Sequence, residues 1–232
     1  MQHSSEALIL GIGNVLWADE GFGVRAVEAL HRAYEFPQGV TLMDGGTQGI
    51  YLVQHVQQAK ILVVFDAIDY GLEPGTLKLI EGEAVPSFLG AKKMSLHQTG
   101  FQEVLAMAEM LGSYPEHLLL VGVQPVQLED FGGSLRPLVK EQIQPAIDAA
   151  LAWLSDRNIH SCLRDDPLPE SSSLSGSAIA IDNYESERPP EHVACRIGDD
   201  RVLQSDAYEV GHRPYPLETD ALSVDVDHRG KY

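Results

Sequence analysis

The chain has 232 residues, enough for one domain of ordinary size with an appendage or for two small domains. Apolar residues make up 44% and charged residues 22%, which excludes collagen-like and wholly disordered classes. The formal net charge of −18 repels nucleic acid and anionic lipid, and no segment has the roughly 20 continuous apolar residues of a membrane span. We therefore expect a folded protein with no nucleic-acid partner and no membrane insertion.

Cysteine usage and the first residues indicate the compartment. The only cysteines, Cys162 and Cys195, form neither a disulfide framework nor a CxxC motif. The start of the chain also lacks the basic residues of a signal peptide. These features predict a cytoplasmic protein.

The composition of the chain changes near Asn158. Residues 1–157 contain both tryptophans and all six phenylalanines, whereas residues 158–232 contain neither and include a serine-rich run over 170–177. We predict a folded domain over 1–157 and an acidic, Pro- and Ser-rich extension over 158–232 that is disordered or loosely docked.

Within residues 1–157, short apolar runs alternate with segments of helical periodicity. The pattern predicts strands at 7–12, 40–43, 61–65, 76–80 and 118–123, and helices at 22–34, 48–57, 99–111 and 138–156. The nearly unbroken apolar run 61–65 is typical of a central parallel strand, whereas 76–80 alternates and is expected nearer an edge. Because parallel neighbours need crossover helices, the fold class is predicted as a three-layer α/β/α sandwich with a mostly parallel sheet of about five strands.

The loop after the first strand is rich in glycine, which raises the possibility of a nucleotide site. However, Leu16 occupies the position where a GxGxxG fingerprint needs its third glycine. Asp44 ends the second strand, where a ribose-binding acid could lie, but it comes later than the usual spacing. A nucleotide-binding oxidoreductase that uses Gly11, Gly13 and Asp44 is therefore an alternative function.

Four polar residues lie in loops that follow predicted strands or precede a predicted helix. Asp19 is expected to cap the following helix, whereas Glu20 can either cap it or point into the crevice. Asp66 directly follows the strand 61–65, which favours a ligand or catalytic role over a turn acid. With His97 before the next helix, Glu20 and Asp66 make a plausible set for nickel, zinc or manganese at one edge of the sheet.

The motifs in this order resemble the nickel-iron hydrogenase maturation endopeptidase family over about residues 5–156. They read GIGNVLWADEGFGV from Gly11, LMDGGT from Leu42, FDA from Phe65, SLHQ from Ser95 and LVGVQP from Leu120. The resemblance implies that Glu20, Asp66 and His97 bind metal, and that Asp44 occupies another functional position. It also implies catalytic roles among the carboxylates Glu20, Asp66 and Asp44.

The resemblance further implies a reaction and a partner. The expected activity is removal of a C-terminal extension from the nickel-loaded precursor of the hydrogenase large subunit. The nickel is expected to arrive with that precursor, and zinc or another divalent ion can replace it. Either Glu20 or Asp66 could activate water, or nickel could only position the cleavage site. A nickel-sensing chaperone that binds the precursor without cutting it is a second alternative, and nothing in the resemblance accounts for residues 158–232.

Overall fold

The computed structural model describes residues 5–89, 96–128 and 130–187. The described residues belong to one compact unit that runs to residue 188, and residues 189–232 lie outside the described part. Among the described residues, no helix is both long enough and apolar enough to cross a bilayer.

Five strands form the main sheet in the order β3-β1-β4-β6-β5. Their bounds are β1 Ser5–Ile12, β3 Val40–Gly46, β4 Ala59–Ala67, β5 Leu77–Glu81 and β6 His117–Val123. All neighbours are parallel except β5, which runs antiparallel to β6 at the edge. The predicted mostly parallel sheet is confirmed, with the run 61–65 in its central strand.

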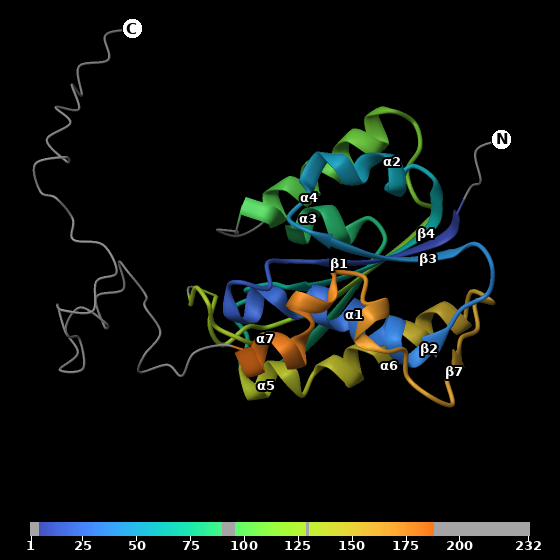
Figure 1. The fold of residues 1–232 in the computed structure, drawn as a ribbon. Coiled ribbons are helices and arrows are strands. Elements are labelled where there is room, and N and C mark those ends of the chain that lie inside the picture. The colour runs from blue at the N-terminus through green and yellow to red at the C-terminus, as the bar shows by residue number, and fades with distance from the viewer. Residues whose placement is uncertain (1–4, 90–95, 129, 188–232) are drawn as a thin grey trace, which may run out of the picture. The chain divides into compact units, whose positions relative to one another are not determined.

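Helices cover both faces of this sheet (Figure 1). One layer holds α2 Val53–Val56, α3 Ala84–Leu89 and α4 Leu96–Met110, and the other holds α1 Phe22–Ala33, α5 Pro137–Lys140, α6 Ile143–Ser155 and α7 Ile181–Glu187. The single helix predicted over 138–156 is instead divided into α5 and α6. Pro145 explains the break, because it cannot donate to the carbonyl of Glu141 in a continuous helix but fits the first turn of a new one.

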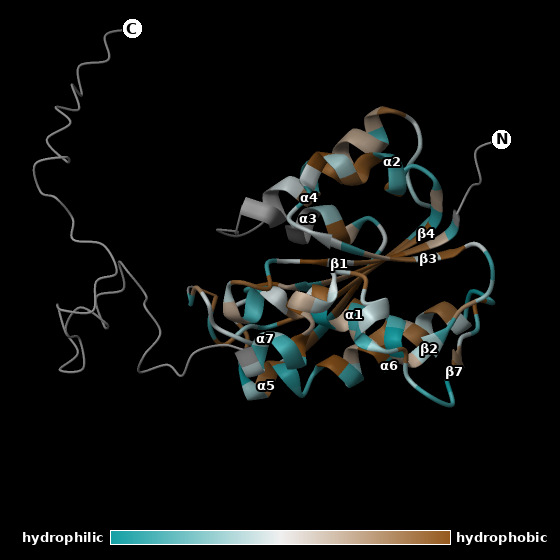
Figure 2. Ribbon diagram, viewed as in Figure 1, coloured by the Kyte–Doolittle hydropathy of each residue, from teal (hydrophilic) through white to brown (hydrophobic). Residues whose placement is uncertain are grey.

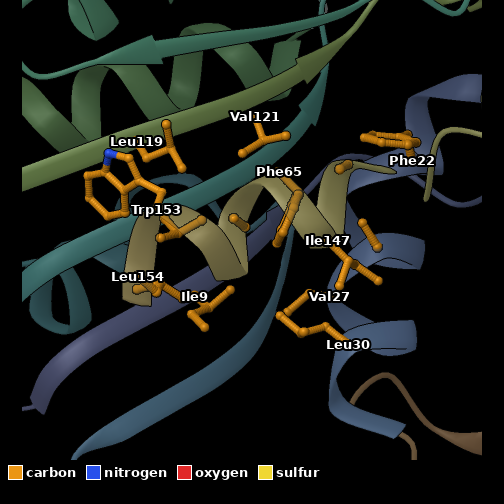
Figure 3. Packing of buried hydrophobic residues seen from close by; sticks show 14 of the residues in the cluster. Ile9, Phe22, Val27, Leu30, Phe65, Leu119, Val121, Ile147, Trp153 and Leu154 are labelled. Carbon is orange, nitrogen blue, oxygen red and sulfur yellow. The ribbon is translucent and has the colours of Figure 1, made fainter. Parts of the chain in front are cut away.

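The core consists of two apolar clusters, one on each face of the sheet. Along β4, Val63 and Phe65 belong to the cluster beneath α1 and α6, whereas Leu62 and Val64 belong to the cluster beneath α2 and α4. This alternation follows from the two-residue period of a strand. Figure 2 shows apolar residues gathered along the sheet and polar ones on outer helix surfaces, and Figure 3 shows Phe65 packed among side chains of α1 and α6.

Two glycines allow α1 to approach the sheet closely. A Cβ atom on Gly23 would lie 2.1 Å from the carbonyl oxygen of Phe65, and one on Gly11 would lie 2.3 Å from that of Gly23. Gly13 has a φ of +135°, and a Cβ there would lie 1.8 Å from the Glu20 carbonyl oxygen. Packing of α1 therefore accounts for Gly11, and the close approach of the Glu20 backbone accounts for Gly13, the two glycines considered for a nucleotide role.

Residues 160–187, which we call the C-terminal strap, run back over the outer face of α1 (Figure 1). The strap contains β7 Cys162–Leu163, η3 Glu170–Ser172, η4 Ser177–Ile179 and α7, and β7 pairs with β2 Tyr34–Glu35. The amide of Leu168 donates to the Arg32 carbonyl at 2.9 Å, and that of Leu174 donates to Glu28 Oε2 at 2.9 Å. The compact unit therefore continues to Arg188, past the boundary at 157 expected from composition.

Candidate functional site

The carboxyl ends of β1, β3, β4 and β6 lie at the same edge of the sheet, which we call the rim. The loops of the rim are 13–21 after β1, 47–48 after β3, 68–76 after β4 and 124–136 after β6. In open parallel sheets, ligands bind outside this edge. Each predicted carboxylate can therefore be placed by the strand that precedes it.

Glu20 lies in η1, a short 3-10 helix over Ala18–Gly21 that contacts β4. Its side chain is half-buried, and its backbone amide donates to the Trp17 carbonyl at 3.0 Å. Two residues later, Phe22 is fully buried in the core and anchors the start of α1. The rigid start of α1 thus holds Glu20 at the rim beside the end of β4.

Asp19 is fully buried and has a role that differs from the one expected. Its Oδ2 accepts the amides of Val126 at 2.9 Å and Gln127 at 2.8 Å, and its Oδ1 accepts the amide of Arg136 at 2.7 Å. The prediction that Asp19 caps its own helix is therefore wrong. Instead, three charge-assisted hydrogen bonds attach the loop that carries Glu20 to the loop after β6.

Asp66 is the penultimate residue of β4 and is buried. Its Oδ1 accepts the amide of Ala67 at 2.8 Å, which is the local bond expected of a turn acid. Tyr70 lies beside it, since burial and the charge of Asp66 both raise the pKa of the Tyr70 phenol. A Cβ on Gly122, the β6 partner of Asp66, would lie 2.1 Å from Tyr70 Oη, so only glycine leaves room for this ring.

Gln124 holds the loop after β4. Its Oε1 accepts the amides of Tyr70 at 2.8 Å and Leu72 at 3.1 Å, and its Nε2 donates to Asp69 Oδ1 at 3.0 Å. Asp69 is exposed and its Oδ1 also accepts the Gly71 amide, so it acts as a turn residue. Gln124 is a polar residue directly after a buried strand, but that position alone does not predict its role.

Asp44 lies near the end of β3, where its loop begins. Its carbonyl accepts Gln48 Nε2 at 3.2 Å, while its buried Oδ1 has no hydrogen-bond partner among the described residues. Burial lowers the pKa of the nearby Arg25 guanidinium, and Asp44 is one of the negative charges that oppose this shift. A buried acceptor without a hydrogen bond costs about 1–3 kcal/mol, a cost often retained at functional positions.

His97 is in the first turn of α4, and its side chain lies outside the described part of the structure. One turn later, a Cβ on Gly100 would lie 3.6 Å from the Cα of Gly49, so the start of α4 adjoins η2 Gly49–Leu52, which follows the loop after β3. No group of three His, Cys, Asp or Glu side chains able to hold a metal occurs within 5–89, 96–128 and 130–187 as described. The trio of Glu20, Asp66 and His97 therefore stays a prediction.

Four exposed apolar residues at the rim form what we call the apolar lip. They are Leu16, Trp17, Val126 and Phe131. The Trp17 and Phe131 rings meet edge to face with centroids 5.3 Å apart, and the Gly132 amide donates to the Leu16 carbonyl at 2.7 Å. Apolar side chains thus surround part of an edge that also carries acidic groups.

Known proteins share both the sequence and this fold. The family model for hydrogenase maturation proteases matches residues 24–153. The hydrogenase expression/formation protein HupD of Thiocapsa roseopersicina is 62% identical over 205 residues, which cover 88% of this chain and 93% of HupD. The hydrogenase 2 maturation protease of Escherichia coli is 40% identical over 68% of this chain and 96% of its own length.

A solved structure of a maturation protease shares this fold. The hydrogenase maturating endopeptidase HybD from Escherichia coli superposes with a TM-score of 0.65 at 38% identity, covering 68% of this chain and 97% of HybD. The shared α/β/α sandwich and these matches define a protease. The chain belongs to the hydrogenase maturation protease family, which confirms the resemblance found in its motifs.

Proposed function

We propose that this protein is an endopeptidase that removes a C-terminal extension from the nickel-loaded precursor of a hydrogenase large subunit. The observation that carries the proposal is the placement of Asp66 at the end of β4, where η1 with Glu20 contacts the same strand. An acidic residue near the end of β4 and another in the adjoining η1, at the edge where such sheets bind ligands, support the proposal.

In this proposal Glu20, Asp66 and His97 bind the nickel that the precursor carries. Two carboxylates and an imidazole suit nickel or zinc and leave positions for ligands from the precursor. Asp44, with its buried Oδ1, is a further acidic group at the same edge. The reaction then depends on metal through its substrate, because a precursor without nickel brings no ion for these three residues to bind.

Hydrolysis requires a water to attack the scissile carbonyl carbon, the C–N bond to break and a proton to reach the leaving amine. The bound ion would polarise the carbonyl or the water. Glu20 or Asp66 would accept the proton of the water and return it to the amine. Tyr70, whose pKa is raised, stays protonated at neutral pH and can donate a hydrogen bond but cannot act as the base.

The apolar lip supports a polypeptide substrate. Exposed apolar patches beside a site commonly bind protein partners. Leu16, Trp17, Val126 and Phe131 offer such a patch next to the loop of Glu20. We place the reaction in the cytoplasm, where the exposed thiol of Cys162 would stay reduced.

The test is to incubate the purified protein with nickel-loaded and metal-free precursor and to measure the intact mass of each product. We expect the loaded precursor alone to lose the mass of its extension. Glu20→Gln, Asp66→Asn and His97→Ala should abolish this loss, whereas Glu116→Gln, an exposed residue at the opposite edge of the sheet, should not change it. A full-length precursor in stable complex would instead support a chaperone, and saturable NAD binding unaffected by His97→Ala would support an oxidoreductase.

A further inference from the structure

The last helix of the strap, α7, is bonded to the loop after β6. Glu185 accepts hydrogen bonds from Ser134 Oγ at 2.7 Å and from Lys140 Nζ at 2.8 Å. Tyr184 Oη donates to the Gly133 carbonyl at 3.3 Å. These contacts join α7 to both the loop 130–136 and helix α5.

Tyr184 and the chain just before α7 also contact the start of α1. The Arg25 guanidinium lies 5.5 Å from the centroid of the Tyr184 ring and donates a hydrogen bond to the Ile179 carbonyl just before α7. Arg25 is buried and lies in the first turn of α1, so its contacts attach α7 to α1. Tyr184 therefore lies between α1 and the loop after β6.

The loop after β6 is in turn bonded to the loop that carries Glu20. The Arg136 amide donates to Asp19 Oδ1, and the Gly132 amide donates to the Leu16 carbonyl. The Phe131 ring contacts the Trp17 ring. A continuous series of hydrogen bonds and packed groups thus leads from α7 through the loop after β6 to the residue next to Glu20.

We propose that Tyr184 and Glu185 are positioning residues, which fix the loop after β6 and through it the loop that carries Glu20. The proposal rests on the proposed function, since it assigns importance to Glu20. Neither side chain has a role in the reaction itself. Small displacements of a catalytic group can lower a rate by roughly 100-fold, so support at a distance can affect turnover.

The strap lies outside the residues that the family model matches. The family model ends at residue 153, before the strap begins. The match to the Escherichia coli protease spans 159 residues, whereas the match to HupD spans 205. The strap thus lies beyond the family model, but the HupD match is long enough to include it, and in this chain it reaches the rim with α7.

The experiment uses the full chain labelled with 5-fluorotryptophan, because Trp17 reports on the rim and Trp153 on the core beneath α6. In ¹⁹F NMR spectra, Trp17→Phe identifies the two resonances. We expect the double variant Tyr184→Ala/Glu185→Ala to shift or broaden the Trp17 resonance, leave that of Trp153 unchanged and lower precursor processing about 10-fold or more.

Two further variants make the test specific. Asp182 lies on the same helix, its side chain is 69% exposed, and its carboxylate lies 3.9 Å from the Arg32 guanidinium. Asp182→Ala should therefore change neither the Trp17 resonance nor processing. Glu185→Gln keeps the shape of the side chain and removes its charge, so it should produce a smaller change of the same kind. If the double variant does not fold, the Trp17 resonance and processing rate of Glu185→Gln decide whether the positioning role holds.

An unchanged Trp17 resonance would overturn the positioning role, as would a shifted resonance with wild-type processing. Equal changes at Trp17 and Trp153 would also overturn it, because they would indicate general destabilisation. If the wild-type protein processes no precursor, the proposed function fails. The Trp17 resonance would then still report whether α7 holds the rim.

Discussion

The two faces of helix α1 are both buried, but by different physical means. The inner face packs on the sheet through apolar side chains such as Val27 and Leu30 and through the close approach at Gly23. The outer face carries Arg25, Glu28 and Arg32, which the strap covers with backbone amides and carbonyls. An apolar contact is visible in sequence periodicity, whereas a polar contact made to the backbone leaves no such pattern.

The largest effect is expected on the inner face, from Gly23→Ala. The added methyl group would overlap the carbonyl oxygens of Phe65 and Ile12, at 2.1 and 2.3 Å, so α1 must move away from the sheet. We expect a loss of more than about 3 kcal/mol in the free energy of unfolding, measured in urea. Gly100→Ala is the control, because its Cβ finds ordinary contact distance and should cost little or stabilise α4.

The next effect is expected at Asp19, which connects two rim loops. Asp19→Ala leaves the amides of Val126, Gln127 and Arg136 without their acceptor. We expect a loss of roughly 2–3 kcal/mol in urea unfolding, and a smaller loss for Asp19→Asn, which retains one acceptor oxygen. A change under about 0.5 kcal/mol would show that the loops are held together by other contacts.

A smaller effect is expected on the outer face of α1, from Glu28→Ala. This change removes the acceptor of the Leu174 amide, but it also removes the buried Oε1, which has no hydrogen-bond partner among the described residues. The two effects partly cancel, so we expect a loss of about 1 kcal/mol. Limited proteolysis should show earlier cleavage within the strap but an intact sheet. Loss of the whole fold would contradict a peripheral strap.

The mildest test is acidification, which should loosen α7 through Glu185. Burial alone would raise the pKa of Glu185, but hydrogen bonds from Lys140 and Ser134 and the nearby charge of Arg25 outweigh it and lower the pKa. A lowered folded-state pKa gives stabilisation that is present above the unfolded value of about 4.3 and is lost as pH falls through the folded value.

The Trp17 ¹⁹F resonance should therefore stay constant at neutral pH and change only below about pH 4. Glu185→Gln should abolish this transition, because its side chain does not titrate. An identical transition in the variant would assign the acid response to another group.

The sequence predicted the elements better than the contacts between them. All five predicted strands are present, including the edge position of 76–80, because apolar period and strand composition report burial directly. The division at Pro145 could have been predicted from its missing amide. The partners of Asp19 and Gln124 could not, since a side chain that accepts amides from a distant loop leaves no pattern in either segment.

The strap shows the same limit on a larger scale. Its serines, prolines and acids are typical of a linker, yet Leu168, Leu174 and Ile179 bind α1 through their backbone groups. Because any sequence carries those groups, composition alone did not distinguish this segment from a disordered one. The carboxylates Glu20 and Asp66 could be placed in advance because each follows a predicted strand or precedes a predicted helix at the rim.

The most direct test of the account is a crystal structure of the protein grown with nickel, with anomalous scattering measured at the nickel absorption edge. We predict one peak at the rim, coordinated by a carboxylate oxygen of Glu20, a carboxylate oxygen of Asp66 and the imidazole of His97. Nickel bound elsewhere, or carboxylates of Glu20 and Asp66 too far apart to share one ion, would contradict it.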